Sequence, residues 1–187
     1  MKIGVLGGTF DPPHDAHLRI AERSIDQFSL DKVIFIPSGN PWQKKDATSY
    51  RYRYEMTKIL IGDFNDLEIS DIENSEEKPS YTYETLKKLN HPKEELYFIL
   101  GSDAAINIKT WKNYELLSNL TNFLIALRSE DNIDVLEKNF PFNYELISGD
   151  KLDLSSTTLR NKLKEKNIEV SDLPSKVLSY IKENSLY

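Results

Sequence analysis

The 187-residue sequence contains no cysteine. This absence excludes disulfides, thiol nucleophiles, cysteine zinc sites and iron–sulfur clusters, and it is compatible with a reducing compartment. Long apolar runs are missing as well, because no stretch approaches the ~20 apolar residues of a membrane-spanning helix. The first residues, MKIGVLGGTFDPP, are too interrupted by Gly and Pro for a secretory signal. We therefore expect a cytoplasmic protein with no membrane partner.

The chain has fewer basic residues than acidic ones. The sequence has 24 Lys and Arg residues against 30 Asp and Glu residues, which gives a formal net charge of -6. A chain with this charge does not attract nucleic acid nonspecifically, so we expect no nucleic-acid partner, and a ligand that carries phosphate would need a local cationic pocket. Hydrophobic residues make up 39% of the chain. A chain of this length buries roughly 70% of its surface on folding, so it needs no disulfide or structural metal.

Strand and helix patterns alternate along the sequence. Apolar runs and alternating patterns predict strands at 2–8, 32–37, 67–72, 96–100, 122–127 and 144–147. Helical spacing of apolar residues lies between them at 18–28, 50–61 and 82–89, and returns at 155–166 and 174–183. This order predicts an α/β fold with a doubly wound, Rossmann-like parallel sheet and a small C-terminal helical part. Ligands of such a sheet bind at the carboxyl ends of its strands.

The segment GGTFDPPHDAH, residues 7–17, connects the first strand to the first helix. Its glycines allow a close approach to the backbone, and the N–H groups at the helix start favour an anion such as phosphate. His14 and His17 are three residues apart, so on a helix they share one face at its positive end and could stabilise charge in phosphate chemistry. A capped turn with two partly exposed histidines is the alternative interpretation. A zinc site would need more ligands than the distant His91 can supply.

The segment LSSTTLR, residues 154–160, is the second candidate site. Hydroxyl residues at a helix start usually cap the helix, and this explains one of them. The cluster and the open N–H groups would form a second anion site. Arg160 lies one turn after Ser156 and projects on the same side, although an Arg on a helix surface is most often solvated.

Two further segments follow predicted strands. In the loop PSGNPWQKK, residues 37–45, a lysine could reach a polyphosphate as a mobile point charge, although adjacent lysines usually serve solubility. Gly101 and Asp103 follow the strand at 96–100. They offer a close-approach glycine and a carboxylate for sugar hydroxyls or a metal, and the alternative for Asp103 is a helix cap.

Together these segments resemble a known enzyme family. GGTFDPPHDAH is similar to the H-x-G-H signature of the nucleotidyltransferase superfamily. IPSGNPWQK, SYTYETL, YFILGSDAAINIKTW, LSSTTLR and the tail LPSKVLSYIKENSLY resemble those of bacterial nicotinate mononucleotide adenylyltransferases in order and spacing. The resemblance covers nearly the whole chain. It implies one nucleotidyltransferase domain over 1–187, with a Rossmann-like core at 1–150 and C-terminal helices at 151–187 that carry the SSTTLR phosphate site.

The resemblance implies transfer of the adenylyl group of ATP to nicotinate mononucleotide, giving nicotinate adenine dinucleotide and pyrophosphate. Mg²⁺ would accompany ATP, bound mainly through phosphate oxygens and water, with no dedicated protein metal site. The implied catalytic residues are His14, His17, Lys44 and Arg160, and the implied ATP-binding residues are Gly8, Thr9, Phe10, Gly101, Asp103, Ser156 and Thr157. The expected partners are ATP and the mononucleotide, in a monomer or homodimer.

The resemblance assigns the nicotinate mononucleotide to Thr82, Trp111 and Arg128. Trp111 would stack on the pyridine ring, backbone N–H groups near Thr82 would meet its carboxylate, and Arg128 matches a basic position of the family. Trp111 could instead anchor the helix that begins there.

Three departures from the family pattern leave other functions open. Ala16 replaces the glycine of H-x-G-H, Trp42-Gln43 stands where many relatives have Pro-His, and Asn107 occupies a position that is aromatic in several members. One alternative is adenylyl transfer to another phosphate acceptor such as phosphopantetheine, which would leave SYTYETL and Trp111 without a role. Another is a nucleotide-binding regulator without turnover.

Overall fold

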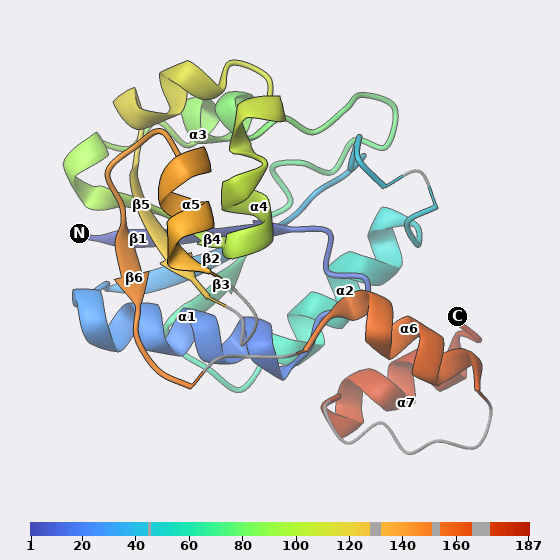
Figure 1. The fold of residues 1–187 in the computed structure, drawn as a ribbon. Coiled ribbons are helices and arrows are strands. Elements are labelled where there is room, and N and C mark those ends of the chain that lie inside the picture. Colours follow the sequence, from blue (N-terminus) through green and yellow to red (C-terminus); the bar gives the residue numbers. More distant parts are fainter. Residues whose placement is uncertain (45, 128–131, 151–153, 166–172) are drawn as a thin grey trace.

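The computed structural model describes residues 1–44, 46–127, 132–150, 154–165 and 173–187 (Figure 1). Its centre is a six-stranded sheet with the order β3-β2-β1-β4-β5-β6, and every neighbouring pair is parallel. The strands are β1 (Ile3–Gly8), β2 (Lys32–Pro37), β3 (Leu67–Ile69), β4 (Leu96–Gly101), β5 (Asn122–Ala126) and β6 (Glu145–Ile147). The predicted doubly wound α/β fold is confirmed.

Helices cover both faces of this sheet. The helices of the described residues are α1 (Asp15–Phe28), α2 (Tyr50–Ile61), α3 (Thr82–Leu89), α4 (Ser102–Ile106), α5 (Ile133–Asn139), α6 (Ser156–Lys164) and α7 (Ser175–Glu183), with short 3₁₀ helices η1 (Lys93–Glu95), η2 (Ile108–Thr110) and η3 (Tyr114–Asn119). Helices α6 and α7 lie beside the sheet rather than over one of its faces (Figure 1). The sequence pattern did not predict α4, α5 or the 3₁₀ helices. These elements are shorter than the window of roughly 11–18 residues over which apolar spacing indicates a helix.

Two hydrophobic clusters hold the layers together. One contains buried side chains of α1, α2, α6 and α7, and the other contains buried side chains of α3, α4 and α5. Each cluster packs against its own face of the sheet, so side chains on both faces of the central strands are buried. This explains why β2 and β4 read as continuous apolar runs rather than alternating ones.

The C-terminal helices share the first of these clusters. Leu159 of α6 and Val177 and Ile181 of α7 are buried together with Met56 and Leu60 of α2. Helix α7 packs directly against α2, and Figure 1 shows α6 and α7 together at one side of the molecule. Among the described residues, no helix is both long enough and apolar enough to cross a membrane.

The strand order reverses direction at β1. From β1 the chain proceeds outward through β2 and β3, and it then returns to the other side of β1 with β4, β5 and β6. Helices leaving β1 and β4 therefore diverge, and a crevice opens at the carboxyl ends of these strands.

Candidate active site

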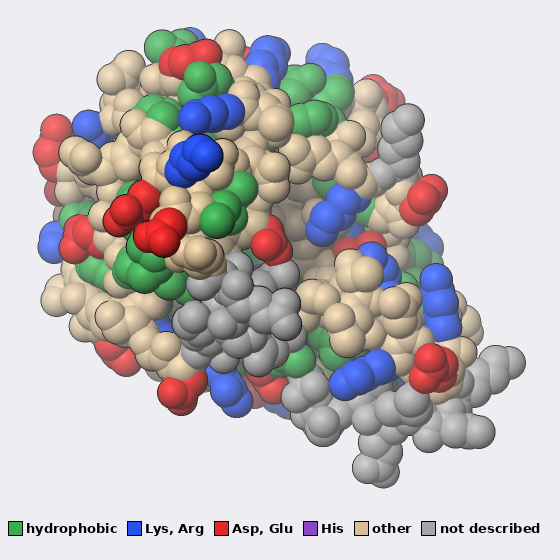
Figure 2. Space-filling model, viewed as in Figure 1, with side chains coloured by type: hydrophobic (Ala, Val, Ile, Leu, Met, Phe, Trp, Pro, Cys, Tyr) green, Lys and Arg blue, Asp and Glu red, His purple; other side chains and the backbone are tan. Residues whose placement is uncertain are grey.

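A cleft of about 880 Å³ lies at the carboxyl ends of β1, β2, β4 and β5. In Figure 2 it is visible as a hollow to the right of centre, on a face where cationic and anionic side chains are interspersed. Most of the residues predicted for the site line this cleft. They are Gly8, Thr9, His14, His17, Lys44, Thr82, Gly101, Asp103, Trp111, Ser156 and Thr157. Segments far apart in the sequence therefore meet in one cavity.

Two of the predicted residues that the structure describes, Phe10 and Arg160, are not on the cleft wall. Phe10 is 2% exposed, has a left-handed backbone (φ 52°) and lies beneath the cleft with its ring centroid 4.9 Å from that of His17. Arg160 is half-buried and contacts the turn between β1 and α1. Arg128 lies outside the described residues.

The first turn of α1 carries the two histidines. His14 is the N-cap residue and is 4% exposed, and its main-chain N–H donates to Nδ1 of His17 at 3.2 Å. The two imidazole centroids are 3.9 Å apart. The predicted shared face is therefore present, at the end of the helix where N–H groups and the positive end of the dipole favour an anion.

The turn at 9–12, which leads into His14, is held from below by Arg53 of α2. This arginine is 1% exposed and donates to the carbonyl oxygens of Thr9 at 2.8 Å, Gly39 at 3.1 Å and Thr48 at 2.6 Å. Burial lowers the pKa of Arg53, and the negative charge of Asp11 opposes this shift. One guanidinium thus ties the turn between β1 and α1 to two points of the loop between β2 and α2 beneath the cleft.

The start of α6 holds the same turn from the other side. Ser156 donates its hydroxyl to the carbonyl of Pro12 at 2.9 Å. Arg160 donates Nη1 to the carbonyl of Asp11 at 2.7 Å and Nη2 to the hydroxyl of Thr157 at 3.2 Å. The helix itself is capped by Ser155, which accepts from the N–H of Thr158 at 3.1 Å. Two helix starts, α1 and α6, therefore converge on one turn.

The other end of the cleft is aromatic. Trp111 is half-buried and meets the ring of Phe98 edge-on, with centroids 6.2 Å apart. Gln43 donates Nε2 to the hydroxyl of Thr110 at 3.3 Å, so the loop that carries Lys44 reaches the wall that carries Trp111. This end can accept a flat ring beside an indole face.

Glu73 also lines the aromatic end, and sequence reasoning missed it. Its Oε1 accepts from the hydroxyl of Thr85, which also donates to the carbonyl of Tyr81 at 3.2 Å. Burial raises the pKa of Glu73, and hydrogen bonds from Thr85 and Ser80 partly oppose the shift. The carboxyl group thereby helps to order the start of α3.

Arg53 was missed for a physical reason. It lies in the sequence YRYRYE, where nothing distinguishes it from the exposed Arg51 two residues earlier. Only the folded chain brings three loop carbonyls to its guanidinium. In the structure, Met56 and Thr57 follow Arg53 at helical spacing and are buried on the same face of α2.

Metal-ligating side chains do not gather in the described part of the chain, where no group of three or more His, Asp or Glu residues is placed to hold a metal ion. The cleft instead combines anion-binding helix starts with an aromatic pocket in a Rossmann-like fold. This combination is that of an enzyme that binds a nucleotide and a second phosphate-bearing ligand.

The chain belongs to the cytidylyltransferase-like family, whose family model matches residues 5–162. Proteins named "Probable nicotinate-nucleotide adenylyltransferase" are similar to it over its full length. The protein from Clostridium novyi is 39% identical over 197 residues, and the protein from Desulfitobacterium hafniense strain Y51 is 40% identical over 197 residues. The alignments cover 100% of this chain and 98% and 95% of the two relatives.

Two solved structures are similar to this chain over its full length. The nicotinic acid mononucleotide adenylyltransferase of Plasmodium falciparum, complexed with NaAD, superposes with a TM-score of 0.83 and is 26% identical. The same protein complexed with APC has a TM-score of 0.80 and is also 26% identical. The matches cover 100% of this chain and 97% and 96% of the two solved chains.

Proposed function

We propose that this protein is a nicotinate-nucleotide adenylyltransferase. An oxygen of the nicotinate mononucleotide phosphate forms a bond to the α-phosphorus of ATP, while the bond from that phosphorus to pyrophosphate breaks and pyrophosphate leaves with the electron pair. One observation carries the proposal. A single cleft joins the paired histidines at the start of α1 to the aromatic pocket at Trp111, so a phosphate and a pyridine ring fit in it together. The full-length relatives support the same reaction.

Catalysis in this proposal is alignment and charge neutralisation, with no covalent enzyme intermediate. His14 and His17 contact the phosphates, and His17 acts on the transferred α-phosphoryl group. Lys44 enters from the loop after β2 as a mobile cation. Backbone N–H groups at Gly8, Thr9 and Phe10 shape the pocket floor.

The second phosphate site is at the start of α6. Ser156, Thr157 and the helix N–H groups lie beside the 9–12 turn, where the released pyrophosphate would develop charge. Arg160 donates to the carbonyl oxygen of Asp11 in that turn. In this proposal Arg160 is a catalytic residue that contributes positive charge at this end of the cleft. Gly101 and Asp103 at the end of β4 hold the adenosine part of ATP.

The mononucleotide occupies the aromatic end. Trp111 stacks on the pyridine ring, and backbone N–H groups near Thr82 at the start of α3 meet its carboxylate. This arrangement favours the acid over the amide, because a carboxylate makes the stronger hydrogen bonds to N–H donors. Arg128 is proposed as a further cation toward the mononucleotide.

Mg²⁺ enters the proposal as the partner of ATP. We propose that the ion is held mainly by phosphate oxygens and water, with no dedicated protein site. Such an ion neutralises triphosphate charge when bound.

We also propose that residues 1–187 form one domain, since α6 and α7 share a hydrophobic cluster with α1 and α2.

An acceptor panel tests this function. Purified protein, ATP and Mg²⁺ are mixed separately with nicotinate mononucleotide, nicotinamide mononucleotide and phosphopantetheine, and pyrophosphate release is measured. We expect the highest kcat/KM with nicotinate mononucleotide. A preference for phosphopantetheine would assign another acceptor, and tight ATP binding by calorimetry without any product would mean a nucleotide-binding regulator.

A further inference from the structure

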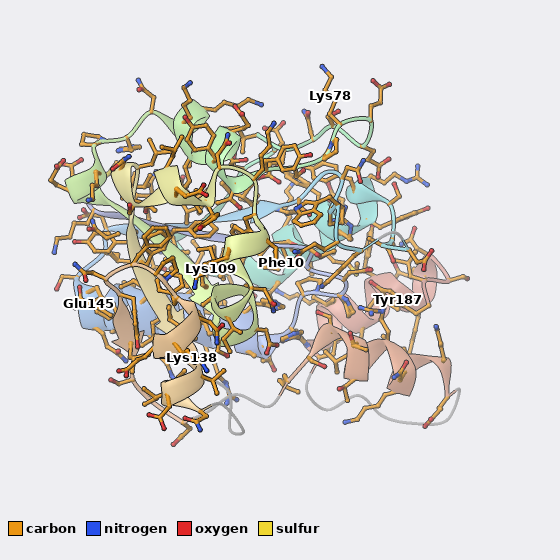
Figure 3. The ribbon with its side chains drawn as sticks, turned by 45° about the horizontal axis from the view of Figure 1, so that its top comes forward. Phe10, Lys78, Lys109, Lys138, Glu145 and Tyr187 are labelled. Atoms are coloured by element: carbon orange, nitrogen blue, oxygen red, sulfur yellow. The ribbon has the colours of Figure 1, made fainter. Side chains whose placement is uncertain are left out.

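Tyr187 contacts the 9–12 turn although it lies at the other end of the sequence. Its hydroxyl donates to Oδ1 of Asp11, and the main-chain N–H of Thr48 donates to Oδ2 of the same carboxylate at 3.1 Å. Asp11 is only 4% exposed. In Figure 3, Tyr187 lies with the C-terminal helices, while Phe10 lies nearer the centre of the molecule. The contact therefore joins the segment after α7 to the turn that leads into His14.

The carbonyl groups of this turn are already held by other residues. Arg53 binds the carbonyl of Thr9, Arg160 binds that of Asp11, and Ser156 binds that of Pro12. The side chain of Asp11 is a separate anchor point, and its two oxygens accept from Tyr187 and from the backbone of the loop before α2. An anchor with two donors fixes both the position and the rotation of the carboxylate.

Tyr187 remains a donor over the neutral pH range. Burial raises the pKa of its hydroxyl, and the hydrogen bond to Asp11 raises it further, so the group keeps its proton. The helix before it does not depend on this hydroxyl. Val177 and Ile181 of α7 are buried in the hydrophobic cluster, and Lys176 pairs with Asp63 at 2.7 Å.

We propose that Tyr187 is a positioning residue for adenylyl transfer. By fixing Asp11 it fixes the 9–12 turn, and through that turn it aligns His14 and His17 with the phosphates. The proposal rests on the proposed function and adds to it a residue remote from the substrates. A residue of this kind affects the alignment reached in the transition state more than the affinity for either substrate.

The first test compares Tyr187→Phe with Tyr180→Phe, a matched control on α7. Both variants keep the aromatic ring, and Tyr180 packs against Tyr52 rather than against the turn. We expect Tyr187→Phe to lower kcat by about tenfold, with both KM values within about twofold of wild type and a melting temperature within about 2 °C. Tyr180→Phe is expected to behave as wild type. An unchanged kcat in Tyr187→Phe, or a loss shared equally by both variants, would overturn the proposal.

A double-mutant cycle with Asp11→Ala tests whether Tyr187 acts through Asp11. In the Asp11→Ala background, Tyr187→Phe is expected to change kcat by less than about twofold, because the group it orients is gone. An undiminished effect in that background would mean that Tyr187 acts by another route, and the proposal would fail.

A third readout does not depend on turnover or on folding of the Asp11 variant. The chain has three histidines, so the imidazole NMR signals of His14 and His17 can be compared with those of His91 as an internal reference. Tyr187→Phe is expected to shift the first two sets and leave the third unchanged. If His14 and His17 do not move, the positioning role is refuted even when the wild-type enzyme is active. If wild type transfers no adenylyl group but the signals move, the proposed function fails and the structural link stands.

Discussion

The main-chain N–H of His14 donates to Nδ1 of His17 at 3.2 Å, which sets the orientation of the second imidazole. Because Nδ1 accepts, the proton of the neutral ring is on Nε2. The Phe10 ring packs against His17 with centroids 4.9 Å apart and supports the same orientation from below. His17 is therefore held as a hydrogen-bond donor with a defined direction, as stabilisation of a developing phosphate charge requires.

Replacing His17 by Ala is expected to lower kcat by on the order of 10²-fold, because the imidazole acts on transition-state charge. Loss of the contact between His17 and the His14 N–H removes a helix cap worth about 1 kcal/mol, so the melting temperature should fall by only about 2–4 °C. Steady-state kinetics and thermal unfolding measure the two effects. His91→Ala is the control for loss of an imidazole elsewhere. A large drop in melting temperature with normal kcat in the folded fraction would show a structural histidine.

Trp111→Ala is expected to raise KM for nicotinate mononucleotide by about tenfold and to leave KM for ATP within about twofold. The loss corresponds to ~1.4 kcal/mol of ring contact between the indole and the pyridine. Trp111→Phe should recover most of this affinity, since it keeps an aromatic face. Initial rates with each substrate varied in turn give both constants. An equal rise in both would mean that the indole serves mainly to pack against Phe98.

Arg53→Met should reduce the free energy of unfolding by about 3 kcal/mol, because three loop carbonyls lose a charged donor in a buried site. Arg51→Met is the matched control, because Arg51 is exposed on the same helix, and its effect should stay within ~0.5 kcal/mol. Urea unfolding followed by circular dichroism measures both. Equal stability of the two variants would contradict the anchoring role of Arg53.

Glu73 predicts a pH dependence of stability. Its pKa is raised in the folded protein, chiefly by burial. The native state therefore holds this proton more tightly than the unfolded chain, and this contribution to the free energy of unfolding decreases as pH rises from the unfolded pKa of about 4.5 through the native one.

Glu73→Gln removes that titration and keeps an oxygen to accept from Thr85. We expect the variant to be more stable than wild type near pH 8, with a flatter stability profile above pH 4.5. Urea unfolding at several pH values gives the profile, with the exposed Glu77→Gln as control. A Glu73→Gln profile parallel to wild type would show that Glu73 has the same pKa in the folded and unfolded states.

Much of the cleft could be predicted because its residues are grouped locally. His14 and His17 lie within one helical turn, and Ser156 and Thr157 lie together at a helix start, so spacing alone places each pair at an anion-binding position. The residues that support the loops around the cleft could not be predicted in this way. Arg53 and Tyr187 contact segments distant in the sequence, Glu73 contacts Thr85 across the loop before α3, and no local pattern marks any of the three.

The amino-acid sequence by itself determined the alternation of strands and helices, the parallel α/β sheet and the positions of the helix starts that we propose bind anions. These follow from apolar periodicity and from the chemistry of Gly, His and hydroxyl residues, which act over a few residues. Only the tertiary structure decided that α1 and α6 meet over one turn, that a buried arginine lies beneath it and that Tyr187 reaches Asp11. Such contacts depend on how the crossovers and the C-terminal helices pack around the sheet, and packing is a property of the whole chain.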